Sequence, residues 1–163
     1  MAWSNPTTPN VTDYTTFLQE DVGIPQGILT ASANAIAVSL SVAVATVTPD
    51  LAAGSCASPV TGLVAVSFYV LACYNLGADR LFNLAPNPPN QTFFSDQREK
   101  MRLLEPAVGI VTTASDQGTA GSLMNPEQLR RLTLADLQTL KTPWGRTYLG
   151  IAQSYGPTLW GLS

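Results

Sequence analysis

The chain has 163 residues, of which 45% are apolar and only 12% are charged, and it contains no histidine. This length and apolar content predict one folded domain and exclude a disordered chain. The absence of histidine removes the most common general base and the most common transition-metal ligand, which argues against an enzyme or a metal-binding protein.

Charged residues are unevenly distributed along the chain. Residues 1–79 contain acids but no Lys or Arg and carry a net charge of −5, whereas residues 80–163 carry +2, which together make the overall −3. The densest basic group, Arg98, Lys100 and Arg102, lies among acids and predicts a solvated helix face rather than a nucleic-acid patch. So little charge on a small domain indicates either membrane segments or a surface that partners cover.

The N-terminal residues predict an extended arm followed by a short helix. Residues 1–11 are rich in Pro, Thr and Asn and read as the arm. Thr12 or Asp13 is expected to cap a helix that runs to about Glu20, and Gly23 is expected to end it. Its apolar face consists of Tyr14, Phe17 and Leu18.

A second helix is expected from Pro25, which suits a first helical turn, to the stop at Pro49. Residues 36–44 also alternate between apolar and other residues at period two, as a strand would. The length of the segment and its many alanines favour the helix. Its apolar stripe recurs at helical steps and consists of Leu29, Ala33, Ile36, Leu40, Ala43 and Val47.

A long helix is predicted from Pro59 to Leu84, with Ser58 as its N-cap. Residues 12–84 would thus form a helical body. Apolar and small residues at helical spacing form its stripe: Leu63, Val66, Val70, Cys73, Gly77 and Leu81. The two cysteines, Cys56 and Cys73, lie in apolar sequence without basic neighbours and are expected to be buried and reduced.

The segment after the long helix predicts a short helix followed by a β-hairpin or extended arm. Ser95 is expected to cap a short charged helix over residues 96–104, which Pro106 stops. Residues 107–124 favour strands around a turn and predict a β-hairpin or extended arm. The candidate contact residues of this arm are Ile110, Val111, Gly118 and Leu123.

Residues 126–156 read as C-terminal helices. Thr142 is expected to cap the last of them, Pro143 to begin it, and Tyr155 to lie near its end. Trp144 and Tyr148 fall four residues apart and share one helix face. Residues 157–163 form an unusually apolar tail that contains Leu159, Trp160 and Leu162.

Two long uncharged runs raise the possibility of membrane insertion. Residues 22–49 and 51–78 each contain 28 residues without Asp, Glu, Lys or Arg, long enough to span a bilayer. Their Ser, Thr and Ala content and the missing positive-inside pattern favour a helical pair packed within a soluble assembly. A two-span, holin-like membrane protein remains the alternative.

Motifs that carry chemistry are missing from the sequence. It contains no Cys-x-x-Cys pair, no phosphate-binding Gly-rich loop with its lysine and no Gly-x-Ser-x-Gly elbow. The adjacent Glu20 and Asp21 point in different directions on a helix end, so paired acid–base work is not expected. We therefore predict no catalytic residues, no cofactor and no metal. A carboxylate hydrolase would instead need a pocket with acids of raised pKa.

Four stretches resemble one known family. They are TDYTTF (12–17), VSFYVLACYNL (66–76), GIVTTASDQGTAGSL (109–123) and LKTPWGRTYL (140–149). In order and pattern they resemble the helical head-to-tail adaptor (connector) proteins of tailed bacteriophages. The third stretch is similar to a Val-Ser-Ser-Ala-Ser-Glu-Gly-Ser-Val-Ser segment of that family, and the fourth to its Thr-Pro-Tyr-Gly-x-x-Tyr/Phe-Leu motif. The His that often follows the second stretch in relatives is absent here.

The resemblance implies a mainly α fold, a helical bundle of two long and several short helices with a β-hairpin or extended arm and an extended C-terminal tail. It implies a ring, usually of twelve subunits, in the virion neck, made in the host cytoplasm and not bound to membrane. One side would bind the portal protein and the other a downstream neck or tail protein, while double-stranded DNA passes through without sequence-specific binding. The candidate residues are Leu159, Trp160 and Leu162 for portal docking, and Thr142, Pro143, Trp144, Gly145 and Tyr148 for packing.

Overall fold

The computed structural model of the protein describes residues 7–49, 51, 67–105, 113–116, 119–122 and 134–155. Most of this part of the chain is helical, as the sequence predicts. Its helices are α1 (Val11–Glu20), α2 (Gln26–Ala31), α3 (Ala33–Thr46), α4 (Phe68–Leu84), α5 (Phe93–Lys100), α7 (Leu134–Thr139) and α8 (Pro143–Tyr155). Its strands are β1 (Thr113–Asp116) and β2 (Thr119–Ser122).

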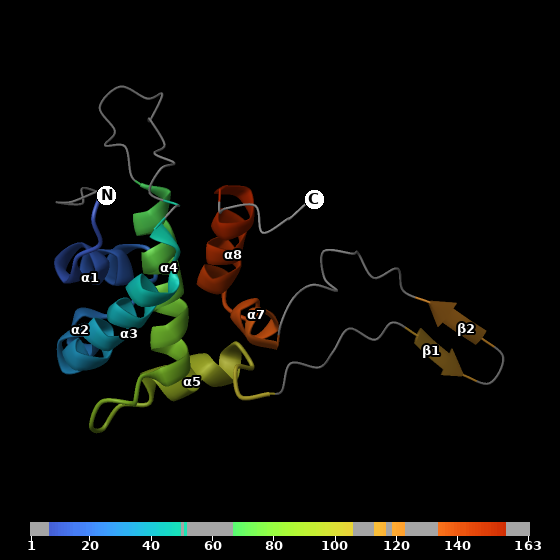
Figure 1. Cartoon of the computed structure of the whole chain (residues 1–163). Helices are drawn as coiled ribbons and strands as arrows, with labels where there is room; N and C mark the ends of the chain where they lie inside the picture. Colours follow the sequence, from blue (N-terminus) through green and yellow to red (C-terminus); the bar gives the residue numbers. More distant parts are fainter. Residues whose placement is uncertain are drawn as a thin grey trace.

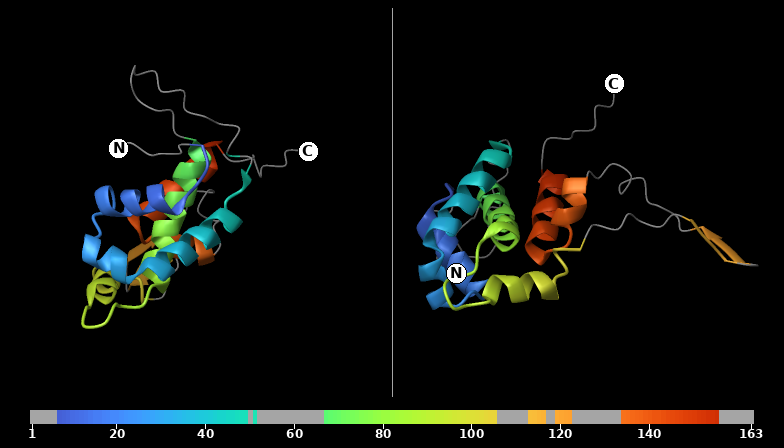
Figure 2. Two further views of the ribbon diagram at one scale, coloured as in Figure 1. Left: turned by 90° about the vertical axis from the view of Figure 1, so that its left-hand side faces the viewer. Right: turned by 90° about the horizontal axis from the view of Figure 1, so that it is seen from below.

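Helix α4 is the centre of the fold. Helices α1, α2 and α3 lie on one side of it and α8 lies on the other, while α5 crosses near its C-terminal end (Figures 1 and 2). Residues 72–79 of α4 are all buried, because packed helices cover the helix from both sides. The core therefore runs along α4.

Helix α1 has the apolar face that the sequence predicts, with Tyr14, Phe17 and Leu18 buried. The predicted cap at Thr12 or Asp13 is wrong, because Asn10 caps the helix. The Asn10 side-chain oxygen accepts a hydrogen bond from the Asp13 backbone N–H at 2.8 Å, and its amide nitrogen donates to the Asp13 carboxylate at 2.8 Å. Asp13 thus completes a reciprocal cap one turn into the helix.

The expected single helix after Pro25 is wrong, since it is split into α2 and α3 at Ser32. Ser32 has φ −108° and ψ 16°, outside the helical region, and Pro25 occupies the N-cap position. The helical stripe is otherwise correct except for the exposed Ala33, and the strand alternative is wrong. The stripe residues that are buried are Leu29, Ile36, Leu40, Ala43 and Val47.

The long helix begins later than the sequence predicts. Ser67 is extended, and its hydroxyl accepts a hydrogen bond from the Tyr69 N–H at 3.2 Å, so α4 starts at Phe68 and a continuous helix from Pro59 is wrong. The end at Leu84 is confirmed. Cys73 is buried and free, and burial raises the pKa of its thiol to about 12. Ser58, Pro59, Leu63, Val66 and Cys56 lie outside the described residues.

Helix α5 differs from its prediction at both ends. It starts at Phe93, after Thr92, so Ser95 does not cap it; the Ser95 N–H instead donates to the Asn87 side chain at 3.0 Å. The helix ends at Lys100 rather than near residue 104. Arg102 follows with φ 51°, the left-handed conformation that commonly terminates a helix.

The basic group of Arg98, Lys100 and Arg102 is not simply a solvated helix face. Lys100 and Arg102 are exposed, as predicted. Arg98 instead donates from Nε to the backbone oxygen of Phe82 at 2.7 Å and from a terminal nitrogen to that of Ala85. A guanidinium at these carbonyls satisfies the C-terminal end of α4 and interacts favourably with the helix dipole.

Strands β1 and β2 pair antiparallel, with Thr113 opposite Ser122 and Asp116 opposite Thr119. In Figure 1 and in the right-hand view of Figure 2 the strand pair lies apart from the helices. The connection at 117–118 lies outside the described residues, as do the candidate contacts Ile110, Val111, Gly118 and Leu123. The hairpin therefore stays a prediction beyond the paired strands.

Helix α8 begins at Pro143 and ends at Tyr155, which confirms the last predicted helix. It runs antiparallel to α4, since Tyr155 stacks on Phe68 near the start of α4 while Trp144 stacks on Phe82 near its end. Among the described residues, no helix is long and apolar enough to cross a membrane.

Candidate functional site

The start of α8 is attached to the middle of α4 through a buried hydroxyl. The Thr142 hydroxyl accepts a hydrogen bond from the Gly145 N–H at 2.9 Å, which is the predicted cap. The same hydroxyl donates to Asp79 Oδ1 at 2.7 Å. Both residues are 0% exposed, so the hydrogen bond is sheltered from water. Asp79 is the residue that sequence reasoning missed, because its partner is distant in the chain.

The surroundings of the Asp79 carboxyl disfavour its charged form. Burial raises its pKa, while the Thr142 hydroxyl and the Arg80 charge lower it to a smaller extent. Its second oxygen, Oδ2, has no hydrogen-bond partner in the described part of the chain. A substrate has no access to the buried pair in this conformation, so the pair positions α8 rather than providing a pocket for acid–base chemistry.

Trp144 packs against α4 at the same junction. Its ring stacks on Phe82, with centroids 4.6 Å apart and planes inclined by 6°. Phe82 also meets Phe93 and Phe94, with ring centroids 6.3 Å and 5.9 Å away. This aromatic cluster joins α4, α5 and α8, and offset or edge-on aromatic pairs stabilise beyond the area they bury. Tyr148 is half-buried and packs against the core from the next turn of α8.

Gly145 is required by the close approach of α7 to α8. A Cβ at this position would lie 1.9 Å from the Thr139 backbone oxygen, a distance that no side chain tolerates. Pro143 begins the helix, where its missing N–H costs nothing. The four residues of the Thr-Pro-Trp-Gly stretch and Tyr148, the five packing candidates, thus lie at one junction of α4, α7 and α8.

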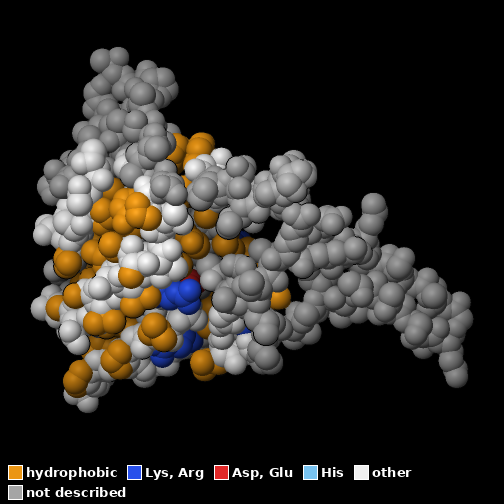
Figure 3. All heavy atoms as spheres, in the orientation of Figure 1, with side chains coloured by type: hydrophobic (Ala, Val, Ile, Leu, Met, Phe, Trp, Pro, Cys, Tyr) orange, Lys and Arg blue, Asp and Glu red, His pale blue; other side chains and the backbone are white. Residues whose placement is uncertain are grey.

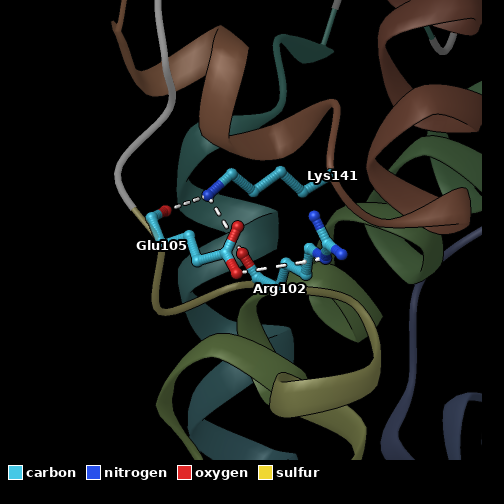
Figure 4. Close-up of polar contacts among 3 residues, drawn as sticks. All are labelled: Arg102, Glu105 and Lys141. Carbon is cyan, nitrogen blue, oxygen red and sulfur yellow. Dashed lines mark hydrogen bonds and ion pairs between the residues drawn. The ribbon is translucent and has the colours of Figure 1, made fainter.

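A second polar cluster links the turn after α5 to the α7–α8 turn. Gln138 Nε2 donates to the Leu103 backbone oxygen at 2.9 Å. Lys141 Nζ donates to the backbone oxygens of Arg102, at 3.2 Å, and of Glu105 (Figure 4). The side chains of Arg102 and Glu105 form an exposed ion pair at 3.9 Å, which contributes little by itself. Residues 106–133, which contain the predicted arm, connect Glu105 to α7 in the chain. We therefore call these contacts the arm base.

The outer face of α3 is apolar and uncharged. Val38, Val42 and Val44 are 51%, 39% and 38% exposed, and no charged residue occurs anywhere in α3. In Figure 3 apolar side chains cover much of the described surface on the side shown, and charged ones appear at few places. Val38 and Val42 lie one turn apart on the same face of α3, whereas Val44 lies on another side of the helix. Neighbouring exposed apolar side chains mark an interaction surface more often than isolated ones do.

A groove lies between the start of α3 and the end of α4, with a volume of about 390 Å³. Its walls are largely apolar. Within it, the Ser32 hydroxyl is buried and has no hydrogen-bond partner in the residues that the structure describes. We call it the α3–α4 groove; its lining includes Ser32, Val38, Arg80, Leu84, Pro86 and Pro89.

The remaining candidate residues are those of the apolar tail. Leu159, Trp160 and Leu162 lie outside the described residues. No group of three or more His, Cys, Asp or Glu side chains in the described ranges is arranged to hold a metal ion. Comparisons with protein-family models, curated proteins and solved structures find no match to this chain. A function for this chain is therefore inferred from the sequence pattern and the geometry of the helices.

Proposed function

We propose that this chain is a head-to-tail adaptor of a tailed bacteriophage, forming a ring that joins the portal protein to the next neck or tail component. The observation that supports the proposal is that the described strands β1 and β2 lie apart from the packed helices (Figure 1), as expected for a helical body with an arm. The α4–α7–α8 junction that holds the body together contains the stretch resembling the adaptor motif. The arm base lies at the two ends of residues 106–133, which contain the other resembling stretch.

Such a division suits a ring subunit. A body made of packed helices contacts its neighbours around the ring through head-to-tail interfaces. An arm that leaves and returns at one place reaches along the tube without disturbing the body's core. The uncharged outer face of α3 supports this proposal, since a face that a neighbour covers needs no solvating charge.

The charge distribution suits a channel for DNA. The overall charge is −3, and the first 79 residues contain no Lys or Arg. A wall of this kind releases few counterions from passing DNA and so binds it weakly and without sequence preference. In this proposal the work of the protein is mechanical: it extends the DNA channel, in a ring for which twelve subunits are the expected stoichiometry.

The apolar tail is the proposed portal contact. Leu159, Trp160 and Leu162 provide aromatic and aliphatic anchors of the kind that contribute most of the binding energy at protein interfaces. The protein would then reside in the virion neck, between capsid and tail, after synthesis in the host cytoplasm.

Electron microscopy and mass photometry of the purified protein test this proposal. We expect closed rings with an open centre and a single stoichiometry, alone or with the portal protein. A variant lacking residues 158–163 serves as the control and should form the same rings but fail to bind the portal protein. A protein that stays monomeric at all concentrations, both alone and with the portal protein, would contradict the proposal.

A further inference from the structure

The α3–α4 groove contains a cation, Arg80, whose guanidinium has no hydrogen-bonded partner among the described residues. Arg80 is half-buried in the groove wall, and within the described ranges it makes no ion pair. The neighbouring Asp79 carboxyl is turned into the α4–α8 interface, where it bonds to Thr142. The Arg80 charge acts on Asp79 only through space, so the guanidinium keeps its N–H donors for an incoming carboxylate.

A second unsatisfied group lies in the same groove. Ser32 is 7% exposed, and its hydroxyl oxygen has no hydrogen-bond partner within the described ranges. Its position at the break between α2 and α3 puts this hydroxyl in the lining that also contains Arg80. A hydroxyl donor and a guanidinium that line one groove are suited to a segment that carries carboxylates.

The chain presents such a segment at the end of α1. Glu20 and Asp21 are both exposed, and neither side chain makes a hydrogen bond or ion pair with another described residue. They stand at the C-terminal end of a helix, where the helix dipole disfavours negative charge. The next residue, Val22, packs against the core of its own chain and holds this end of the helix in place. We call Glu20 and Asp21 the acidic end of α1.

We propose that the α3–α4 groove receives the acidic end of α1 from a neighbouring copy of this chain, with Arg80 pairing with its carboxylates. The Ser32 hydroxyl donates to the same carboxylates. Each copy offers both halves of the contact, a groove and an acidic end, on different elements. The contact is therefore heterologous, and repeating it generates a closed ring when the rotation closes. The inference rests on the ring of the proposed function and names its subunit interface.

Sedimentation velocity measurements on the whole chain and its variants test this contact. Arg80→Gln and Ser32→Ala are each expected to weaken self-association, Arg80→Gln by about tenfold or more, since a charge pair in the contact is lost. Ser32→Ala removes an unsatisfied buried hydroxyl, so its folding stability should stay equal or rise while association falls. Lys100→Gln, an exposed cation outside the groove, is the matched control and should assemble as the unaltered protein does.

A charge exchange completes the test. The combined variant Arg80→Glu, Glu20→Lys and Asp21→Lys should recover association that Arg80→Glu alone loses, with folding checked by circular dichroism. Rings that persist unchanged in Arg80→Gln, or an exchange variant that fails to recover association, would overturn this inference and leave the proposed ring standing. An unaltered protein that never self-associates would overturn both.

Discussion

Glycine-to-alanine substitutions at two positions of α8 should change stability in opposite directions. Gly145 lies against α7, where an added Cβ would meet the Thr139 backbone oxygen at 1.9 Å. Gly150, five residues further along the same helix, is exposed, and no atom lies within 4 Å of the place that an added Cβ would take. The two substitutions are chemically identical, so any difference between them comes from the surroundings.

The magnitudes follow from geometry. Carbon and carbonyl oxygen ordinarily meet at about 3.3 Å or more, so the Gly145→Ala methyl group is about 1.4 Å too close to a backbone atom that cannot rotate away. Overpacking of this kind typically costs about 1–3 kcal/mol, and disturbing the Thr142 cap costs about 1 kcal/mol more. At Gly150 alanine only gains helix propensity, up to about 1 kcal/mol. The free energies of unfolding should therefore differ by about 2–5 kcal/mol between the variants.

Urea unfolding followed by circular dichroism measures this difference directly. Gly145→Ala should unfold at lower urea than the unaltered protein and Gly150→Ala at slightly higher urea. Thermal midpoints should be separated by on the order of 10 °C. Equal stability of the two variants, within about 0.5 kcal/mol, would refute the close approach of α7 to α8 and with it the reason for glycine at position 145.

Three further predictions concern the junction and the arm. Thr142→Val should cost about 2–3 kcal/mol of unfolding free energy, because it removes both the cap and the donor to Asp79. Thr142→Ser keeps the hydroxyl and should cost less than about 1 kcal/mol. Equal losses of the two variants in urea unfolding would contradict the role of the hydroxyl. Burial raises the pKa of Asp79 in the folded state above its ordinary value near 4, so the folded state holds the proton more tightly than the unfolded state. The stability that this proton contributes is complete below the ordinary pKa and is lost as the pH rises through the folded-state pKa. Asp79→Asn should therefore match the unaltered protein at about pH 4 and exceed its stability at about pH 7, and an unchanged pH dependence of unfolding would count against this. Replacing residues 106–133 by a short Gly/Ser linker should leave the helical body folded, with a thermal midpoint within a few degrees; loss of cooperative unfolding would show that the arm is part of the core.

Elements with strong local signals were predictable from the sequence. The apolar face of α1 and the position of α8 follow from apolar spacing and from the Thr142 and Pro143 pair, in which a cap and a preorganised first turn lie side by side. The end of α4 at Leu84 follows from the prolines after it. These signals act within a few residues, so they do not depend on the rest of the fold.

Element boundaries that depend on competing partners were not predictable. Asn10 caps α1 in preference to Thr12 because it pairs reciprocally with Asp13. Ser32 interrupts a segment whose apolar stripe continues through it, so the pattern gives no sign of the break. Ser67 is one of several serines that satisfy the rule for an N-cap, and the chain uses it instead of Ser58 to begin α4.

Composition and periodicity are local properties, and they were enough to establish a mainly helical chain, its uncharged first half and the motif at the start of α8. What that motif does depends on the packing of the helices. The partner of Thr142 is Asp79, which is 63 positions away, and the neighbour that requires glycine at position 145 is the backbone of α7. Contacts of this kind form when distant segments pack, and a carboxylate or a glycine gives no local sign of what it will meet there.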